Sequence, residues 1–241
     1  MNAQHYIQSD VLRRLNWLKH AVTTRKFNPE PLGKIPGMKK MAQALKISPE
    51  AYLFGKQAHT ANSAFVYDLS HNDDNLMEFP NTDAVGTGIP LVFTTVFTAD
   101  CVPVFLADLK NRRIMLIHSG WRGTLSRTTQ NAVKRLVLLG ASPAEIVSWI
   151  GPSIGICCYE VSPELAADFS VEFPDCPDCI EGRYLDLKGL NKFQITSCGV
   201  PEENIEVSEY CTSCRKDMFY SYRAEGGLKG RIFSSAVILP G

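Results

Sequence analysis

The chain has 241 residues, of which 45% are hydrophobic and 21% charged, so it is long enough to bury a full hydrophobic core. Twenty-five basic residues balance twenty-five acidic ones, and the formal net charge is therefore zero. This balance gives no support to binding of nucleic acid or of an anionic membrane through a basic surface, and we expect a small-molecule partner instead.

Apolar runs typical of β-strands recur along the chain and alternate with helical patterns. The strand-like runs cover residues 64–67, 91–98, 102–107, 114–118, 147–150 and 234–239. A helix is predicted over residues 126–139, with Gly140 as its stop, and Ser142-Pro143 and Ser162-Pro163 predict two further helix starts. This alternation predicts an α/β or α+β fold in which helices cover mixed sheets. Because no repeat, low-complexity segment or linker divides the chain, we expect one domain of residues 1–241.

The sequence carries no signal for membrane insertion or export. No apolar run approaches the length of a membrane span, and the N-terminus lacks the basic and apolar regions of a signal peptide. We therefore expect a cytoplasmic protein. In a reducing compartment the eight cysteines should be thiols or metal ligands and not disulfides.

Four of the cysteines form two Cys-x-x-Cys pairs, Cys176 with Cys179 and Cys211 with Cys214. Each pair has the spacing of half a zinc ribbon, so the two pairs together could hold one structural zinc ion. The second pair, however, runs into the apolar and aromatic segment 218–222. We favour unligated thiols over a joint zinc site, and we give a disulfide the least weight.

A thiol and an imidazole stand where two apolar runs end. Cys101 follows the run 91–98, and His118 ends the run 114–118 shortly before a glycine. Such side chains at strand ends are typical of a metal site or of a nucleophile with its base. Because successive side chains of a strand point to opposite faces, Asp100 and Cys101 share a pocket only if the strand has already ended. We expect Cys101 to be a ligand and Asp100 to support it through hydrogen bonds, with a role in proton transfer left open.

A zinc site needs a third protein ligand, because a catalytic zinc commonly has three protein donors and one water molecule. The remaining imidazoles are those of His5, His20, His59 and His71. His71 lies in an aspartate-rich polar turn, whereas His59 precedes the strand-like run at 64–67. We therefore favour His59 as the third ligand.

Four motifs follow one another along the chain. They are Thr98-Ala99-Asp100-Cys101-Val102-Pro103-Val104, His118-Ser119-Gly120-Trp121-Arg122-Gly123-Thr124, Ile150-Gly151-Pro152-Ser153-Ile154-Gly155 with Tyr159-Glu160-Val161, and Phe219-Tyr220-Ser221-Tyr222-Arg223. In order and spacing they resemble the laccase-domain family, which is also called YfiH-like. The resemblance extends from Thr23-Thr24-Arg25 to Gly230-Arg231 and so covers nearly the whole chain.

The resemblance implies a single α/β domain with a layered, sandwich-like arrangement and an active site that holds one zinc ion. The implied zinc ligands are His59 of a Gln-x-His motif, Cys101 and His118. Members of the family are similar in acting on purine nucleosides. The resemblance therefore implies phosphorolysis of adenosine, inosine and methylthioadenosine, together with deamination of adenosine. We expect a monomer whose partners are a nucleoside and phosphate.

Phosphate binding would need cationic side chains that form forked hydrogen bonds. Arg25, Arg122 and Arg223 are the candidates, although each is also compatible with a structural ion pair. Many family members carry an Asn-Arg pair in the region where this chain has Lys39 and Lys40. A lysine offers a point charge in place of the arginine fork, which weakens the case for full phosphorylase activity.

Other functions stay open beside this one. The family's older name suggests a copper-dependent polyphenol oxidase, since two histidines and a cysteine can bind copper, but five scattered histidines cannot supply a multicopper site. Further alternatives are a thiol hydrolase with Cys101 as nucleophile and His118 as base, a noncatalytic metal-binding module, and a hydrolase that edits peptidoglycan precursors. The zinc-dependent base deaminases are excluded, because His59 is followed by Thr60-Ala61 and neither Cys-x-x-Cys pair follows a proline.

Overall fold

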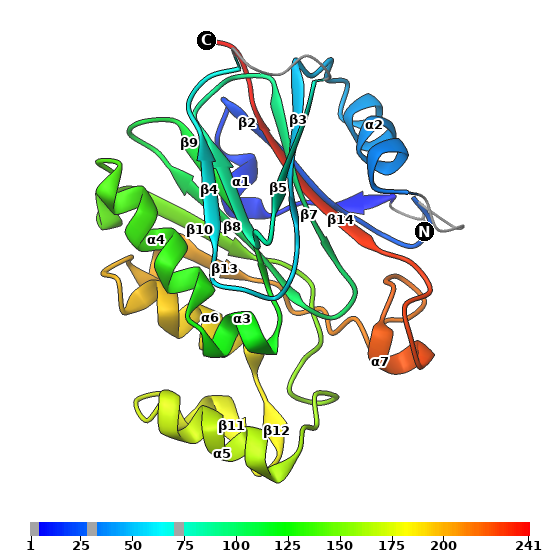
Figure 1. Cartoon of the computed structure of the whole chain (residues 1–241), viewed down its shortest axis with the longest axis vertical. Coiled ribbons are helices and arrows are strands. Elements are labelled where there is room, and N and C mark those ends of the chain that lie inside the picture. The colour runs from blue at the N-terminus through cyan, green and yellow to red at the C-terminus, as the bar shows by residue number, and fades with distance from the viewer. Residues whose placement is uncertain (1–4, 28–32, 70–74) are drawn as a thin grey trace.

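The computed structural model describes residues 5–27, 33–69 and 75–241, which form two six-stranded mixed sheets and one small sheet (Figure 1). The first sheet has the order β1 (Tyr6–Ile7), β2 (Leu18–Thr23), β14 (Ile232–Ile238), β7 (Val92–Thr98), β3 (Ala51–Lys56) and β5 (Leu76–Pro80). The second has the order β13 (Ile205–Val207), β10 (Ile146–Ile150), β8 (Val102–Asp108), β9 (Arg113–Ser119), β6 (Ala84–Thr87) and β4 (Ser63–Val66). The small sheet pairs β11 (Ile180–Glu181) with β12 (Tyr184–Leu185).

The two large sheets pack face to face and enclose a hydrophobic core. Strands β7, β8, β10 and β14 are buried along their whole length, as expected for strands covered on both faces. The core contains Leu53 and Val96 from the first sheet and Phe105 and Trp149 from the second. This shared core holds the strand ends of the two sheets in fixed positions relative to one another.

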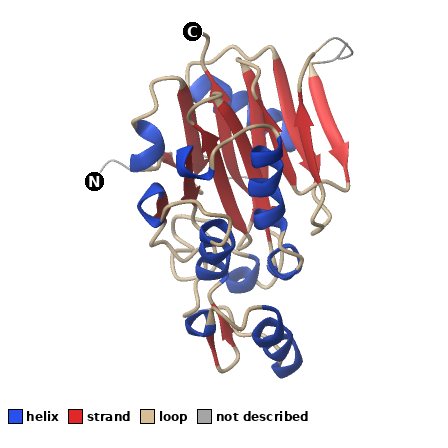
Figure 2. Cartoon of the chain, turned by 90° about the vertical axis from the view of Figure 1, so that its left-hand side faces the viewer, coloured by secondary structure: helices blue, strands red, loops and turns tan. Residues whose placement is uncertain are grey.

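Helices cover the outer faces of both sheets, so the layers run helix, sheet, sheet, helix (Figures 1 and 2). Met38 and Met41 of one helix pack on the first sheet. Ala132 and Leu136 of another pack on the second. The helices are α1 (Asp10–Arg13), α2 (Lys34–Ala44), α3 (Trp121–Leu125), α4 (Thr128–Leu138), α5 (Pro163–Glu172), α6 (Leu187–Thr196) and α7 (Tyr222–Glu225), with 3₁₀ turns η1 (Pro143–Glu145), η2 (Pro177–Cys179) and η3 (Glu202–Asn204). The predicted α/β sandwich is confirmed.

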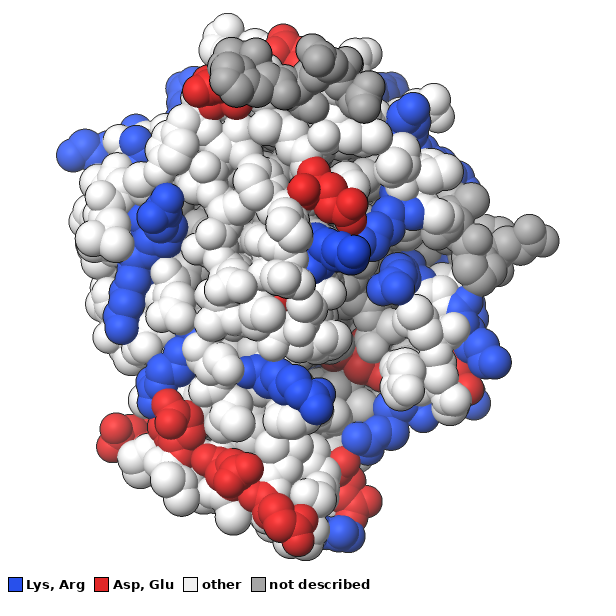
Figure 3. Space-filling model, in the orientation of Figure 1, with Lys and Arg blue, Asp and Glu red and all other residues white. Residues whose placement is uncertain are grey.

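Helix α5 lies with β11 and β12 at the lower end of the molecule (Figure 1). Ser162 caps it by accepting a hydrogen bond from the Leu165 N–H, and Pro163 occupies its first turn. Phe169 and Phe173 stack with their ring centroids 5.9 Å apart and join the core beneath the second sheet. Figure 3 shows a band of acidic side chains at this lower end and basic side chains across the middle of the same face.

The strand-like runs of the sequence correspond to β4, β7, β8, β9, β10 and β14. The helix predicted over 126–139 begins only at Thr128, because Arg127 has a left-handed φ of 57° that interrupts the chain after α3. Ser162-Pro163 begins α5 as predicted, whereas Ser142-Pro143 begins only the turn η1. In the described part of the chain, no helix is both long enough and apolar enough to cross a membrane.

The prediction that all eight cysteines are thiols or metal ligands is wrong for one pair. Cys176 and Cys179 form a disulfide, because the turn η2 brings their Cα atoms to 5.6 Å, within the range that a disulfide spans. A zinc site shared by this pair with Cys211 and Cys214 is therefore ruled out. The free cysteines are Cys101, Cys157, Cys158, Cys198, Cys211 and Cys214.

Candidate metal centre

His59, Cys101 and His118 meet where strands of the two sheets end. β3 and β7 are parallel neighbours, so their carboxyl ends lie at one edge, and the loops that follow them carry His59 and Cys101. In the second sheet, Pro103 of β8 pairs with His118 of β9. This pairing places His118 beside the start of β8 and thus close to Cys101. The topology therefore brings three separate segments to one point.

The three side chains form a compact group of donors. Their potential ligand atoms, a sulfur and one nitrogen from each imidazole, all lie within 4.8 Å of one another. Cys101 Sγ lies 4.0 Å from His59 Nε2, and the centroids of the two imidazole rings are 4.9 Å apart. His118 is buried, whereas His59 is exposed. One sulfur and two nitrogens are donors that zinc accepts, and the exposed side could leave a fourth position open to solvent.

Asp83 is a buried carboxylate behind this group, and sequence reasoning missed it. It stands immediately before β6 and is fully buried. His118 Nδ1 donates to Asp83 Oδ1 at 2.8 Å, which leaves His118 Nε2 available for a metal ion. Histidine ligands of metals are commonly oriented by a carboxylate in this way. In the sequence, Asp83 is marked only by its place in a polar turn before the short run 84–87. The sequence does not show that this run pairs with β9, which carries His118.

The same carboxylate holds the loop that carries His59. The backbone N–H groups of Ala58, His59 and Thr60 donate to Asp83 at 3.2, 3.1 and 2.7 Å, and the Thr60 hydroxyl donates at 2.8 Å. His59 has a φ of 59°, a left-handed conformation that a residue with a side chain keeps only when its surroundings hold it. One carboxylate therefore fixes both imidazoles, through the side chain of His118 and through the backbone of His59.

Gln57, the first residue of the Gln-x-His motif, extends the pairing of β3 with β7. Its side-chain amide donates to the Phe97 carbonyl at 2.7 Å, and its side-chain oxygen accepts from the Phe97 N–H at 2.8 Å. The glutamine thus takes the place of a backbone partner just beyond the end of β3. Through this anchor the loop delivers His59 to the edge where Cys101 lies.

The ionisation of the buried side chains is coupled. Burial alone would raise the pKa of Cys101, but the positive charge and hydrogen bond of His118, together with His59, lower it to about 6. Burial alone would lower the pKa of His118, but the Cys101 thiolate and the Asp83 carboxylate raise it to about 9. Burial opposes ionisation of Asp83 as well, yet hydrogen bonds from His118 and Thr60 lower its pKa to about 2. Cys101 is therefore a thiolate at neutral pH, which is the form that binds metals.

Gly120 lies directly against the donor group. A Cβ atom at this position would lie 2.8 Å from Cys101 Sγ and 3.0 Å from His59 Cδ2, closer than packed atoms tolerate. The glycine after His118-Ser119 is therefore explained by close approach of the backbone to the donors, and not by an unusual φ.

The carboxylate of Asp100 binds the C-terminal segment of the chain. Its Oδ1 accepts from the Thr212 hydroxyl at 2.6 Å, and its Oδ2 accepts from the Arg223 backbone N–H at 2.7 Å. Asp100 has a φ of 92°, which is uncommon for a residue other than glycine. Its hydrogen bonds hold this turn between β7 and β8, next to Cys101.

Two of the three candidate phosphate ligands form side-chain hydrogen bonds within the chain. Arg25 donates to Glu225 at 2.8 Å in a partly buried ion pair. The guanidinium of Arg223 donates to the carbonyls of Cys158 and Glu160 at 3.0 and 2.9 Å. Both side chains thus tie the C-terminal segment to other parts of the fold.

Tyr159 interacts electrostatically with Cys101 of the donor group and with Arg122. Arg122 is exposed and stacks on the Trp121 ring at 3.9 Å, and among the described residues its guanidinium has no hydrogen-bond or ion-pair partner. Burial and the negative charges of Cys101 and Asp100 raise the pKa of Tyr159 well above its usual range, although the positive charges of Arg223 and, to a smaller extent, Arg122 oppose this shift. The Tyr159 hydroxyl therefore stays neutral and can donate a hydrogen bond.

The remaining sequence candidates lie elsewhere. Neither His5 nor His20 belongs to the donor group, and the His20 ring packs edge-on against Trp149 in the core. His71 lies outside the described residues. Lys39 and Lys40 are on α2, where Lys40 donates to the Phe27 carbonyl beside the outer face of the first sheet.

These observations define an α/β sandwich with a buried carboxylate and a group of donors that could hold a metal ion. Over residues 37–239 the chain matches the family described as multi-copper polyphenol oxidoreductase laccase. The chain belongs to this family, as its motifs predicted.

Named relatives and a solved structure support the same assignment. The chain is 33% identical over 200 residues to a purine nucleoside phosphorylase of Bacteroides thetaiotaomicron, and the aligned region covers 79% of this chain and 74% of the relative. It is 29% identical over 203 residues to Adenosine deaminase RL5 of an unknown prokaryotic organism, with coverage of 80% and 78%. The crystal structure of YlmD from Geobacillus stearothermophilus matches with a TM-score of 0.85 at 25% identity, over 100% of this chain and 98% of that one.

Proposed function

We propose that the protein is a zinc-dependent purine nucleoside phosphorylase that also deaminates adenosine. Its substrates would be adenosine, inosine and methylthioadenosine, each cleaved by phosphate to the free base and the sugar 1-phosphate. The observation that carries the proposal is the group of His59, Cys101 and His118 with Asp83 behind it. The names of two relatives, a purine nucleoside phosphorylase and an adenosine deaminase, cover both reactions.

The donor group suits zinc. A thiolate and two imidazoles bind zinc in catalytic sites that keep a fourth position open. Asp83 supports such a site because it holds the Nδ1 proton of His118 and leaves the Nε2 lone pair free. A zinc ion held by these side chains would supply Lewis-acid chemistry, because it polarises an oxygen ligand and makes water acidic near neutral pH.

Phosphorolysis also requires a place for phosphate. In this reaction a phosphate oxygen attacks C1′ of the sugar, the bond from C1′ to the purine nitrogen breaks, and the proton that the phosphate gives up ends on the released base. Arg122 is our candidate to hold the phosphate, because its exposed guanidinium can form forked hydrogen bonds. Tyr159 keeps its proton and could donate to phosphate or to a sugar hydroxyl. Arg25 and Arg223, which bond within the chain, would support the site indirectly.

Deamination would use the same purine site with water in place of phosphate. Water adds its oxygen at C6 of adenosine, ammonia leaves, and inosine forms. The two reactions therefore compete for one bound nucleoside, and the phosphate concentration should decide between them.

A product assay tests this function. Zinc-loaded protein is incubated with adenosine at increasing phosphate concentrations, and the bases and nucleosides are separated by chromatography. We expect adenine to appear in proportion to bound phosphate, and inosine to form when phosphate is absent. Arg122→Lys should raise the KM for phosphate and leave the KM for adenosine close to wild type. Absence of adenine at every phosphate concentration would contradict the phosphorylase proposal.

The identity of the metal is tested separately. Elemental analysis of the purified protein should find zinc, and Cys101→Ala or His118→Ala should each lose the zinc of this site. A different result would favour the oxidase that the family description suggests. In that case the wild type would contain copper and oxidise a polyphenol, and both variants would lose the copper.

A further inference from the structure

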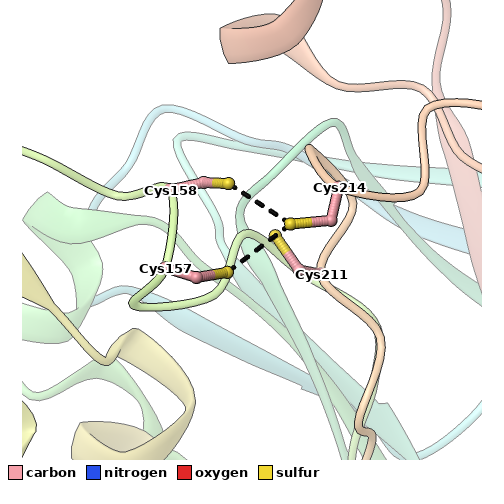
Figure 4. Close-up of side chains that lie close together, drawn as sticks. All are labelled: Cys157, Cys158, Cys211 and Cys214. Carbon is pink, nitrogen blue, oxygen red and sulfur yellow. Dashed lines mark hydrogen bonds between the residues drawn. The ribbon is translucent and has the colours of Figure 1, made fainter.

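A second group of donors lies at the edge of the second sheet. β10 and β13 are parallel neighbours, so their carboxyl ends lie side by side. The chain after β10 carries Cys157 and Cys158 in one turn, and the chain after β13 carries Cys211 and Cys214 in another. Figure 4 shows that the four thiols point toward one another from these two turns.

The four sulfur atoms have the spacing that a single metal ion requires. All lie within 4.8 Å of one another, and Cys214 Sγ lies 3.6 Å from Cys157 Sγ and 3.4 Å from Cys158 Sγ. Tetrahedral zinc with Zn–S bonds of about 2.3 Å places its ligand sulfurs about 3.8 Å apart. A disulfide would instead need about 2.05 Å, and all four cysteines are free. An iron–sulfur cluster places several atoms between its cysteines and would need a wider group.

The backbone around Cys211 is arranged for a metal-bound thiolate. Ser153 and Cys211 form an isolated parallel bridge, and the Thr212 N–H donates to the Ser153 carbonyl at 2.9 Å. The Gly155 N–H donates to Cys211 Sγ at 3.2 Å, and such a donor orients a ligating sulfur. A Cβ at Gly155 would lie only 3.3 Å from Cys157 Sγ, so the glycine leaves room for the sulfurs.

A buried cation lies next to this group. Lys188 is only 8% exposed, and its ammonium donates to the carbonyls of Ser208 and Tyr210, the second of which immediately precedes Cys211. Four thiolates around one divalent ion carry a net charge of about −2, because each thiolate contributes one negative charge. The ammonium of Lys188 therefore offsets part of the charge that a metal-loaded site would carry.

We propose that Cys157, Cys158, Cys211 and Cys214 bind one zinc ion in a closed, tetrahedral, four-thiolate site. On binding, the four thiols release their protons to solvent and each sulfur forms one bond to the metal. Four protein ligands leave no open position, so this site is structural. Its zinc joins two turns that are far apart in the sequence and stabilises the fold.

The four-thiolate site also braces the turn that carries Cys101. Thr212, which lies inside the Cys-x-x-Cys pair, donates to the Asp100 carboxylate at 2.6 Å. The Arg223 guanidinium donates to the Cys158 carbonyl at 3.0 Å, while its backbone N–H donates to Asp100 at 2.7 Å. The turn that carries Cys211 and Cys214 is therefore hydrogen-bonded directly to Asp100, the neighbour of Cys101. The turn that carries Cys157 and Cys158 is connected to Asp100 through Arg223.

Zinc counting on matched variants tests the proposal. Protein purified under reducing conditions is loaded with zinc chloride, freed of excess metal and analysed for zinc per chain. We expect two zinc ions in the wild type, one in Cys214→Ser, one in Cys101→Ala and none in the double variant. Cys198→Ser removes a free cysteine outside both groups and should keep two.

A second measurement needs no variant. The wild type is treated with a thiol-alkylating reagent, with and without a zinc chelator, and the modified peptides are identified by mass spectrometry. Zinc should protect all four cysteines, and chelation should expose them together while Cys198 reacts equally in both samples. Equal alkylation with and without chelator, or a single zinc that Cys101→Ala removes, would overturn the proposal. Neither measurement depends on nucleoside turnover, so failure of the proposed function would leave this inference intact, and the reverse also holds.

Discussion

Asp83 is the residue on which the geometry of the donor group depends. A carboxylate has about four lone-pair sites, and burying one without partners is strongly unfavourable. Here the backbone of residues 58–60, the Thr60 hydroxyl and the His118 imidazole all donate to it. Asp83 is therefore fully satisfied although it is fully buried, and the same bonds that satisfy it orient two donors.

Replacing Asp83 with asparagine should weaken metal binding. The new amide would present N–H groups to backbone donors, and the charge that orients His118 would be lost. Loss of such a supporting partner typically reduces metal affinity roughly 10–100-fold. Competition with a chromophoric chelator measures the zinc affinity of Asp83→Asn. Asp217→Asn, which removes an exposed ion pair with Arg215, is the control, and equal affinities of Asp83→Asn and wild type would refute this role.

The sequence singled out His59, Cys101 and His118 because imidazoles are few and two of these side chains end strong apolar runs. The structure brings their donor atoms within 4.8 Å, while their role as zinc ligands stays a prediction. Asp83 could not be found in this way, since its contact with His118 spans 35 residues and depends on the pairing of β6 with β9. The four-cysteine group was missed for the same reason, because it depends on the pairing of β10 with β13.

At the scale of elements, the site is produced by strand ends that the sheet order brings together. Just beyond the end of β3, the Gln57 side chain forms two hydrogen bonds with the backbone of Phe97 in β7. It satisfies both backbone groups of Phe97, a residue that is only 1% exposed. Loss of this side chain would leave a buried N–H and a buried carbonyl without partners.

Gln57→Ala should therefore destabilise the protein by about 1–3 kcal/mol, the usual cost of unpaired buried polar groups. It should also lower zinc affinity, because the loop that carries His59 loses its anchor. Urea unfolding and chelator competition measure the two effects. Gln43→Ala, at an exposed position of α2, is the control, and a Gln57→Ala protein as stable as this control would argue against the anchor.

The strands that the sequence predicted are those rich in apolar and β-branched residues, such as β7 and β8. Strand β2 was not predicted, because Lys19 and His20 interrupt its apolar pattern. Helix α2 was not predicted either, since Pro36 and Gly37 in its first turn weaken the helical signal. The order of strands in the sheets depends on contacts between distant segments, and local patterns carry no information about these contacts.

At the scale of the whole molecule, the interface of the two sheets holds a titratable group. His20 of β2 is 1% exposed, and its ring packs edge-on against Phe105 and Trp149 of the opposite sheet. Its Nε2 accepts from the Ser9 N–H at 2.8 Å, so the ring is neutral with its proton on Nδ1. Burial, with a smaller effect of Arg13, lowers the pKa of His20 to about 4.

This pKa makes stability depend on pH. Unfolded His20 takes up a proton near its ordinary pKa of about 6.5, whereas the folded ring stays neutral down to about 4. The stabilisation is therefore complete above pH 6.5 and is lost as the pH falls through that window, by about 3 kcal/mol in total. Urea unfolding of wild type and His20→Gln between pH 7 and pH 4 should show free energies that converge as the pH falls. A constant difference across the window would contradict this assignment.

The central claim is that the group of His59, Cys101 and His118 supports phosphorolysis of a purine nucleoside. The most direct test follows ribose 1-phosphate by phosphorus NMR in a mixture of adenosine, phosphate and zinc-loaded protein. We predict that the wild type produces ribose 1-phosphate together with an equal amount of adenine, and that Cys101→Ala produces neither while remaining folded. Absence of ribose 1-phosphate with the wild type, or its undiminished formation by Cys101→Ala, would contradict the claim.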